Sequence, residues 1–300
     1  MDLVYENIWT TPPGAHIKQT LPGTNHSYSF PPRRSVLTGN RKRMRHFLEL
    51  LHHGTIALAF QPILSSDTDH TPLYYETLLW QADCAGTTYA SASHIIPPLE
   101  REGLIERLDA CVLRTIIQVL QEHPTVHLGC NLSPLTLKHG PWWQSIFSTL
   151  QQQPDVAHRL ILEITESACP SNPDDASLIL QTLRDLGCRI ALDDLGTGFN
   201  TLDLAWHLQP DLAKLDKSLV HCARSPQGFS RLHRLIESLR PLCGVLVAEG
   251  IETDEDLDRV AGMGVQAVQG YLTGKPSLLP DCRPLPVSVH DFFRSTDFQQ

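Results

Sequence analysis

The chain has 300 residues, 41% of them hydrophobic, and a formal net charge of −9. This length is enough to bury one large core or two modest ones, and the acidic balance argues against a general nucleic-acid-binding protein, which would carry a basic surplus. No apolar run approaches the roughly 20 residues of a membrane-spanning helix, and the polar N-terminus lacks the apolar stretch of a signal peptide. We therefore expect a cytoplasmic protein that neither enters a membrane nor binds duplex nucleic acid.

Residues 1–45 differ from the rest of the chain. They contain several prolines and a basic cluster at Arg41, Lys42, Arg43 and Arg45, which predicts an irregular extension. A helix with the sequence MRHFLELLHHG follows and ends at Gly54. A basic run of this kind is usually a solvated face, and a contact with an acidic partner or nucleic acid is the alternative. We predict one domain over residues 46–285 and a tail over residues 286–300.

Strand-like and helical segments alternate from Thr55 onward. The strand-like runs are 56–64, 73–80, 126–132, 159–164, 188–193, 211–215, 244–248 and 265–268. Helical periodicity occurs at 105–121, 174–186, 229–240 and 254–262, and Asn172, Pro173 and Gly187 are typical helix-boundary residues for the second of these. Eight apolar strands with interleaved helices predict an α/β protein with a TIM-type (β/α)8 barrel.

The first two strands are predicted to depart from a regular barrel. Only eight residues, SSDTDHTP, join them, whereas a parallel crossover needs a dozen or more. We therefore expect an antiparallel first strand pair.

Polar side chains follow the apolar runs where the strands end. They are Glu76, Asn131, Glu163, Asp193, Asp194, Lys214 and Glu249. In β/α barrels, functional groups gather at the carboxyl ends of the strands. A pocket that gathers five carboxylates needs divalent cations to offset their repulsion, and oxygen ligands favour Mg²⁺ or Mn²⁺ over zinc.

Adjacent residues of a strand point to opposite faces, so Asp193 and Asp194 converge on one site only if the chain turns there. The following Leu-Gly-Thr-Gly segment supplies two glycines for that turn. One bridging carboxylate then predicts a two-metal site suited to phosphate-ester hydrolysis. Each residue also has an ordinary interpretation, such as a solvent-exposed rim glutamate, a capping asparagine or a surface lysine. These ordinary interpretations would all have to be correct at once, at the ends of successive strands.

At these positions the chain resembles the EAL-domain cyclic di-GMP phosphodiesterases. The similar segments, in order, are FQPI (60–63), YYETLLW (74–80), IIPPLEREGLIERLDACVL (95–113), CNLSPLTL (130–137), LEITES (162–167), ALDDLGTGFNTL (191–202), LAKLDKSLV (212–220), VAEGIET (247–253) and VQGYLTGKP (268–276). The resemblance covers about residues 50–280 and implies hydrolysis of cyclic di-GMP to linear pGpG.

The resemblance also implies a role for each residue. One metal would be held by Glu76, Asn131, Glu163 and Asp193, and the other by Asp193, Asp194 and Glu249. Lys214 would orient or deprotonate the attacking water or stabilise phosphate charge. The implied substrate-binding residues are Gln61, Leu78, Asn131 and Gln269. Glu166 would anchor the loop 195–202, which the family links to metal occupancy and to dimerisation, so a homodimer is expected.

Several positions depart from the family pattern. Thr77 replaces the signature alanine, and Leu195 and Phe199 replace the usual loop aromatics. Trp80 stands where the family usually has an arginine that binds a substrate phosphate, and losing that contact would weaken binding by roughly 1.5–3 kcal/mol. The alternative to an active enzyme is therefore a catalytically weak or inactive module that binds cyclic di-GMP or a protein partner. A barrel metalloenzyme acting on a carbonyl acid and a transcription regulator using the basic N-terminal segment are less well supported.

Overall fold

The computed structural model describes residues 56–67, 70–82, 89–165, 170–196 and 201–277. The predicted helix at 44–54, the N-terminal extension and the tail lie outside these residues. Within them, nine strands form one sheet in the order β1-β9-β8-β7-β6-β5-β4-β2-β3, and a β1–β2 pairing closes it. The strands are β1 (Ile56–Ser65), β2 (Pro72–Ala82), β3 (Tyr89–Ser91), β4 (Leu128–Leu132), β5 (Leu160–Thr165), β6 (Arg189–Leu195), β7 (Leu212–Leu215), β8 (Val245–Ala248) and β9 (Ala267–Val268).

The closed sheet is an eight-stranded barrel, which confirms the predicted fold class. Strand β1 runs antiparallel to both β2 and β9, and every pairing from β2–β4 round to β8–β9 is parallel. The antiparallel first pair is thus confirmed as well. The short strand β3 pairs with the end of β2 that extends beyond β4.

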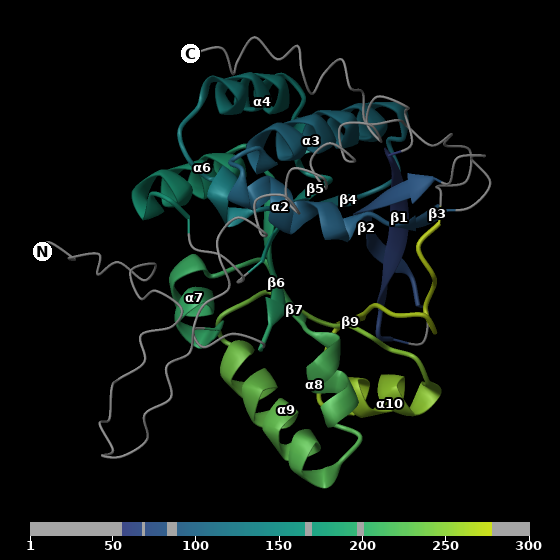
Figure 1. The fold of residues 1–300 in the computed structure, drawn as a ribbon. Helices are drawn as coiled ribbons and strands as arrows, with labels where there is room; N and C mark the ends of the chain where they lie inside the picture. Colours follow the sequence, from purple (N-terminus) through teal and green to yellow (C-terminus); the bar gives the residue numbers. More distant parts are fainter. Residues whose placement is uncertain (1–55, 68–69, 83–88, 166–169, 197–200, 278–300) are drawn as a thin grey trace, which may run out of the picture.

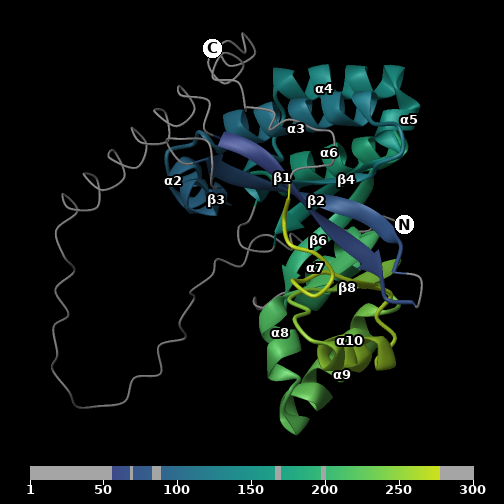
Figure 2. The same cartoon turned by 90° about the vertical axis from the view of Figure 1, so that its right-hand side faces the viewer.

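Helices cover the barrel on opposite sides (Figures 1 and 2). The helices α3 (Ile105–Glu122), α4 (Pro141–Gln152) and α6 (Pro173–Asp185) lie on one side, and α8 (Lys217–Cys222), α9 (Pro226–Leu239) and α10 (Asp254–Gly262) lie on the other. The remaining short helices are η1 (Ser93–Ile95), α2 (Ile96–Arg101), η2 (Pro134–Thr136), α5 (Pro154–Ala157) and α7 (Thr201–Leu208). No helix in the described ranges is long and apolar enough to cross a membrane.

The four helices predicted from periodicity are present as α3, α6, α9 and α10. At α6, the Asn172 side chain accepts hydrogen bonds from the backbone N–H groups of Asp174 and Asp175, and Pro173 occupies the first turn, as predicted. Helices α7 and α8 were missed because 8 and 6 residues are too few to establish a helical period. Helix α4 was also missed, although its buried residues Trp142, Trp143, Ile146 and Leu150 follow helical spacing.

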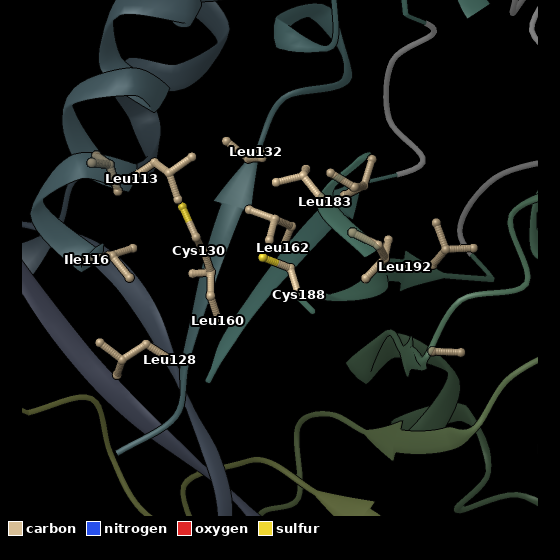
Figure 3. Packing of buried hydrophobic residues seen from close by; sticks show 14 of the residues in the cluster. Leu113, Ile116, Leu128, Cys130, Leu132, Leu160, Leu162, Leu183, Cys188 and Leu192 are labelled. Atoms are coloured by element: carbon tan, nitrogen blue, oxygen red, sulfur yellow. The ribbon is translucent and has the colours of Figure 1, made fainter. Parts of the chain in front are cut away.

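The outer faces of the strands form the main core. Leu128, Cys130 and Leu132 of β4 alternate with inward-facing residues and belong to the same buried cluster as Leu113 and Ile116 of α3 (Figure 3). Strands in such a barrel are buried on both faces, which is why they read as continuous apolar runs in the sequence. The five cysteines in the described residues are free thiols.

The inner faces of the strands form two layers. The lower layer is apolar, buried and made by Ile63, Tyr74, Ile161, Ala191, Leu212, Val247 and Ala267. Side chains alternate along a strand, so the residue two positions away faces the same interior. The next inward-facing residue lies two positions nearer the carboxyl end of each parallel strand, or two positions nearer the N-terminus on antiparallel β1. These residues are Gln61, Glu76, Glu163, Asp193, Lys214, Glu249 and Gln269. The layer above the apolar one is therefore entirely polar.

Candidate metal and active site

A buried lysine occupies the centre of the polar layer. The Lys214 side chain is 0% exposed, and its Nζ atom contacts carboxylate oxygens from four different parts of the barrel. The distances are 2.7 Å to Glu163, 2.8 Å to Glu249, 2.9 Å to Asp193 and 3.2 Å to Glu76. A charge this deeply buried is tolerated only when it is paired. Lys214 is therefore an integral part of the cluster.

Amide side chains orient Glu76 from both sides. Asn131 Nδ2 donates to Glu76 Oε1 at 2.8 Å, and Gln269 Nε2 donates to Glu76 Oε2 at 2.6 Å. Gln269 also donates to Gln61 Oε1 at 3.2 Å, and Gln61 donates to the carbonyl oxygen of Gly274 at 3.0 Å. The structure thus places Gln61, Asn131 and Gln269, all predicted from the sequence, in one network with Glu76.

The chain turns at the paired aspartates, and the turn begins ahead of the glycines that the sequence offers for it. Asp194 itself adopts the left-handed conformation, with φ of 57°, and Gly196 follows with φ of 98°. The β6–β7 register shifts between Leu192 and Leu195, so this irregularity directs both carboxylates to the same site. A non-glycine residue with positive φ is uncommon, and such strain occurs preferentially at functional sites.

Gly129 makes room for Glu163, and sequence reasoning did not identify it. A Cβ atom at Gly129 would lie 2.0 Å from Glu163 Oε1 and 2.9 Å from the Tyr74 ring. The residue two positions before Asn131, on the same face of β4, must therefore be glycine. The available signal was a glycine inside an otherwise apolar strand, which often marks a close approach.

A buried carboxylate also fixes the turn after Asn131. Asp109 on α3 accepts hydrogen bonds from the Ser133 backbone N–H at 3.0 Å and from the Thr136 hydroxyl. Glu100 accepts from the Ser133 hydroxyl at 2.8 Å. Burial raises the pKa of Asp109 to about 7, although these hydrogen bonds oppose the shift. The sequence signal was an aspartate within the apolar face of the helix, and it was missed.

The electrostatics of the cluster show an excess of negative charge. Burial raises the pKa of Glu163 to about 8 despite the nearby Lys214 charge. Burial raises the pKa of Asp194 to about 6, with a contribution from Asp193, and it holds the pKa of Glu249 well above its usual range. For Glu76, burial is outweighed by Lys214 and by the amide hydrogen bonds, so its pKa is lowered.

The pKa of Lys214 reflects the same excess of negative charge. Burial alone would lower the pKa of its ammonium group, but the four surrounding carboxylates raise that pKa well above its usual value. In addition, Glu163 Oε1 is buried and has no hydrogen-bond partner among the described residues. A single ammonium group is therefore too little positive charge for this cluster.

Two groups of carboxylates can each hold a metal ion. Glu76, Glu163 and Asp193 form one group, and Asp193, Asp194 and Glu249 form the other. Within each group the ligand atoms lie within 4.8 Å of one another, and Asp193 belongs to both. The donors are all oxygen atoms, and the partnerless Glu163 oxygen is suited to a cation, so these residues fit hard divalent metals.

The other predicted residues lie at the rim or outside the described ranges. Leu78 and Trp80 are half-buried and follow Glu76 at two-residue intervals on β2, so they share its face above the polar layer. Glu166, the predicted loop anchor, and Phe199 lie outside the residues that the structure describes.

Comparison with known proteins identifies relatives of this barrel. The EAL domain family matches residues 44–276. The chain is 30% identical over 246 residues to cyclic di-GMP phosphodiesterase PdeF of Escherichia coli strain K12, covering 79% of this chain and 32% of that protein. It is 27% identical over 257 residues to cyclic di-GMP phosphodiesterase NbdA of Pseudomonas aeruginosa, covering 83% and 32%. The chain therefore spans about a third of the length of these curated relatives.

Solved structures show the same barrel. The PaMucR phosphodiesterase in complex with c-di-GMP matches with a TM-score of 0.65 and 25% identity, covering 75% of this chain and 98% of that chain. The FimX EAL domain from Pseudomonas aeruginosa bound to c-di-GMP matches with a TM-score of 0.68 and 24% identity, covering 78% and 96%. The second likeness shows the fold alone.

Proposed function

Because the chain belongs to the EAL domain family, we propose that it is a metal-dependent phosphodiesterase that hydrolyses cyclic di-GMP to linear pGpG. The observation that carries this proposal is the pair of carboxylate groups that share Asp193 around Lys214. A bridging carboxylate between two groups of oxygen donors suits an in-line displacement at phosphorus.

The site is proposed to hold two Mg²⁺ or Mn²⁺ ions. Five carboxylates and one ammonium group leave four negative charges, which two divalent cations neutralise. One ion would be held by Glu76, Asn131, Glu163 and Asp193, and the other by Asp193, Asp194 and Glu249. When bound, the ions would supply an activated water and stabilisation of phosphate charge. The raised pKa of Glu163 and Glu249 supports this count, since both carboxylates need more positive charge to remain ionised.

The protein's own groups would orient the reactants. Lys214, whose ammonium group stays protonated in this environment, would hold the attacking water or stabilise charge on the phosphate. Gln61, Asn131 and Gln269 form a network of amides beside Glu76, where they would contact the substrate. Leu78 would contact the substrate from the rim, and Glu166 would anchor the loop that follows Asp194.

The cellular context is part of the same proposal. We place the protein in the cytoplasm as a homodimer, with a domain over residues 46–285 between an irregular basic extension (1–45) and a tail (286–300). The family match over residues 44–276 supports the extent of the domain.

A chromatographic assay tests the proposal. The purified chain, freed of metal with EDTA and then supplied with Mg²⁺ or Mn²⁺, should convert cyclic di-GMP to pGpG. Full turnover without added metal would contradict the two-metal assignment. Ca²⁺ should inhibit, because it prefers longer bonds and more ligands than the smaller ions.

The second candidate is a module of the same fold that binds cyclic di-GMP or a protein partner with little or no turnover. Trp80, which stands in place of a charged phosphate-binding residue, is the observation that favours it. Calorimetric binding of cyclic di-GMP in Mg²⁺, together with no pGpG in the chromatogram, would support this module over the enzyme.

A further inference from the structure

The loop that carries Glu249 is held from both ends. Residues 249–253 connect β8 to α10. The Glu249 backbone N–H donates to the Leu215 carbonyl at 3.1 Å, and the Ile251 N–H donates to the Gln269 carbonyl at 3.0 Å. These bonds fix the loop to β7 and to the end of β9, on its barrel side.

Helix α8 holds the outer side of the same loop. Gly250 has φ of 70°, and a Cβ atom there would lie 2.4 Å from the Lys217 Cβ, so the loop packs directly on the first turn of α8. One turn further along α8, His221 Nε2 lies 3.1 Å from the Gly250 carbonyl oxygen. The position of Glu249 therefore depends on how α8 and the loop stay together.

An ion-pair cluster joins the turn that directly follows α8, the loop and α10, and we refer to Arg224, Glu252 and Asp256 as the α8–α10 clamp. Arg224 Nε and Nη2 donate to the two Asp256 carboxylate oxygens at 3.1 and 2.7 Å, and Nη2 also donates to Glu252 at 3.2 Å. The Asp256 side chain is 1% exposed, and Arg259 adds a further hydrogen bond at 2.8 Å. The hydrogen bonds from Arg224 lower the pKa of Asp256 to about 2.

We infer that the α8–α10 clamp positions Glu249 toward the carboxylate group it shares with Asp193 and Asp194, with Arg224 as the key positioning residue. Glu252 is three residues beyond Glu249, and Asp256 lies in the first turn of α10, where the Thr253 hydroxyl accepts a hydrogen bond from its N–H at 3.2 Å. The clamp therefore fixes the end of the loop opposite β8. This inference rests on the proposed function, because it takes Glu249 as a metal ligand.

Arg224 is suited to this role because it adds little to the core. Its side chain is 43% exposed, and within the described ranges its side-chain hydrogen bonds go to Glu252 and Asp256. A bidentate guanidinium–carboxylate pair fixes orientation more strictly than a point charge. Among the described residues, the Glu252 carboxylate pairs with Arg224 at 3.2 Å and with His221 at 3.6 Å. Without Arg224 the longer pair with His221 is left, and the loop becomes more mobile.

The test measures Mn²⁺ binding in the full chain by electron paramagnetic resonance and calorimetry. Arg224→Met should weaken one of two Mn²⁺ sites at least tenfold and leave the other within twofold of wild type. Arg224→Lys should restore part of that affinity, because lysine keeps the charge but not the bidentate geometry. Arg231→Met, at an exposed arginine of α9, is the matched control and should bind Mn²⁺ like wild type.

Glu252→Gln provides a second variant in case Arg224→Met does not fold, because it leaves Asp256 paired with both arginines. It should weaken the same Mn²⁺ site by a smaller factor. If Arg224→Met and Glu252→Gln both bind two Mn²⁺ ions with wild-type constants, the clamp is only structural and the inference is wrong. If wild type itself binds no pair of Mn²⁺ ions, the two-metal assignment fails instead.

Discussion

Replacing Lys214 with methionine should destabilise the metal-free protein far more than the metal-loaded protein. The substitution keeps the length of the side chain and removes the charge that four carboxylates contact within 2.7–3.2 Å. Removing one partner of a buried ion pair typically costs about 3–5 kcal/mol. In saturating Mg²⁺, bound cations would replace the missing charge, so we expect a loss of less than half of that value.

The cost should also depend on pH. Glu163 and Glu249 have raised pKa values, so without Lys214 they take up protons more readily as the pH falls. A carboxylate whose folded-state pKa is raised destabilises the protein as pH rises from its unfolded to its folded pKa. The metal-free variant should therefore lose more stability at pH 8 than at pH 6.

Urea denaturation in EDTA and in Mg²⁺ measures this difference directly. Lys138→Met is the matched control, because Lys138 is 43% exposed and pairs with Glu106 at 2.8 Å; such surface pairs contribute at most about 1 kcal/mol. Equal destabilisation of Lys214→Met in EDTA and in Mg²⁺ would refute the reasoning, since Lys214 and the metals would then not share the same carboxylates.

Three further predictions concern the site and its rim. Glu76→Ala and Asp193→Asn should each abolish pGpG formation while circular dichroism shows a folded barrel; wild-type kcat in either variant would exclude that residue's assigned role. Because the folded-state pKa of Asp109 is about 7, the wild type should lose up to about 1.4 kcal/mol of unfolding free energy per pH unit as the pH rises from about 4 to 7. Asp109→Asn should remove this loss, as measured by urea denaturation in Mg²⁺; parallel pH curves for wild type and variant would contradict this. Trp80→Arg should lower KM about tenfold, equivalent to roughly 1.4 kcal/mol, with kcat largely kept; a raised KM would instead indicate that Trp80 stacks on a base.

The barrel and the position of the site were predictable because both follow from strand periodicity. An apolar run that ends in a charged or amide residue indicates which end of the strand is functional, and eight strand-like runs with interleaved helices predict a closed barrel. The short loop before β2 was enough to predict that β1 runs antiparallel. These are local properties, so they can be predicted from short segments of the sequence.

The side-chain partnerships were less accessible because they depend on strand closure and on long-range packing. Lys214 meets Glu76 only because β7 and β2 face each other across the barrel, 138 positions apart in the chain. Gly129 is required because β4 and β5 place it beside Ile161, below the paired Asn131 and Glu163. The contact of Arg224 with Asp256 joins the turn after α8 to α10 across 32 positions of the chain, and no local pattern marks it.

The two-layer interior explains why the cation requirement is built into the fold. The apolar lower layer excludes water beneath the carboxylates, and this desolvation raises the pKa of Glu163 and Glu249. The polar layer starts only two residues further along each strand, so the charges cannot move away from that dry surface without a change of register. A register slip of one residue would instead send these side chains to the outer core. The alternation of side chains along the strands, which forms the barrel, therefore also fixes the carboxylates in place. Bound cations must then supply the positive charge that balances them.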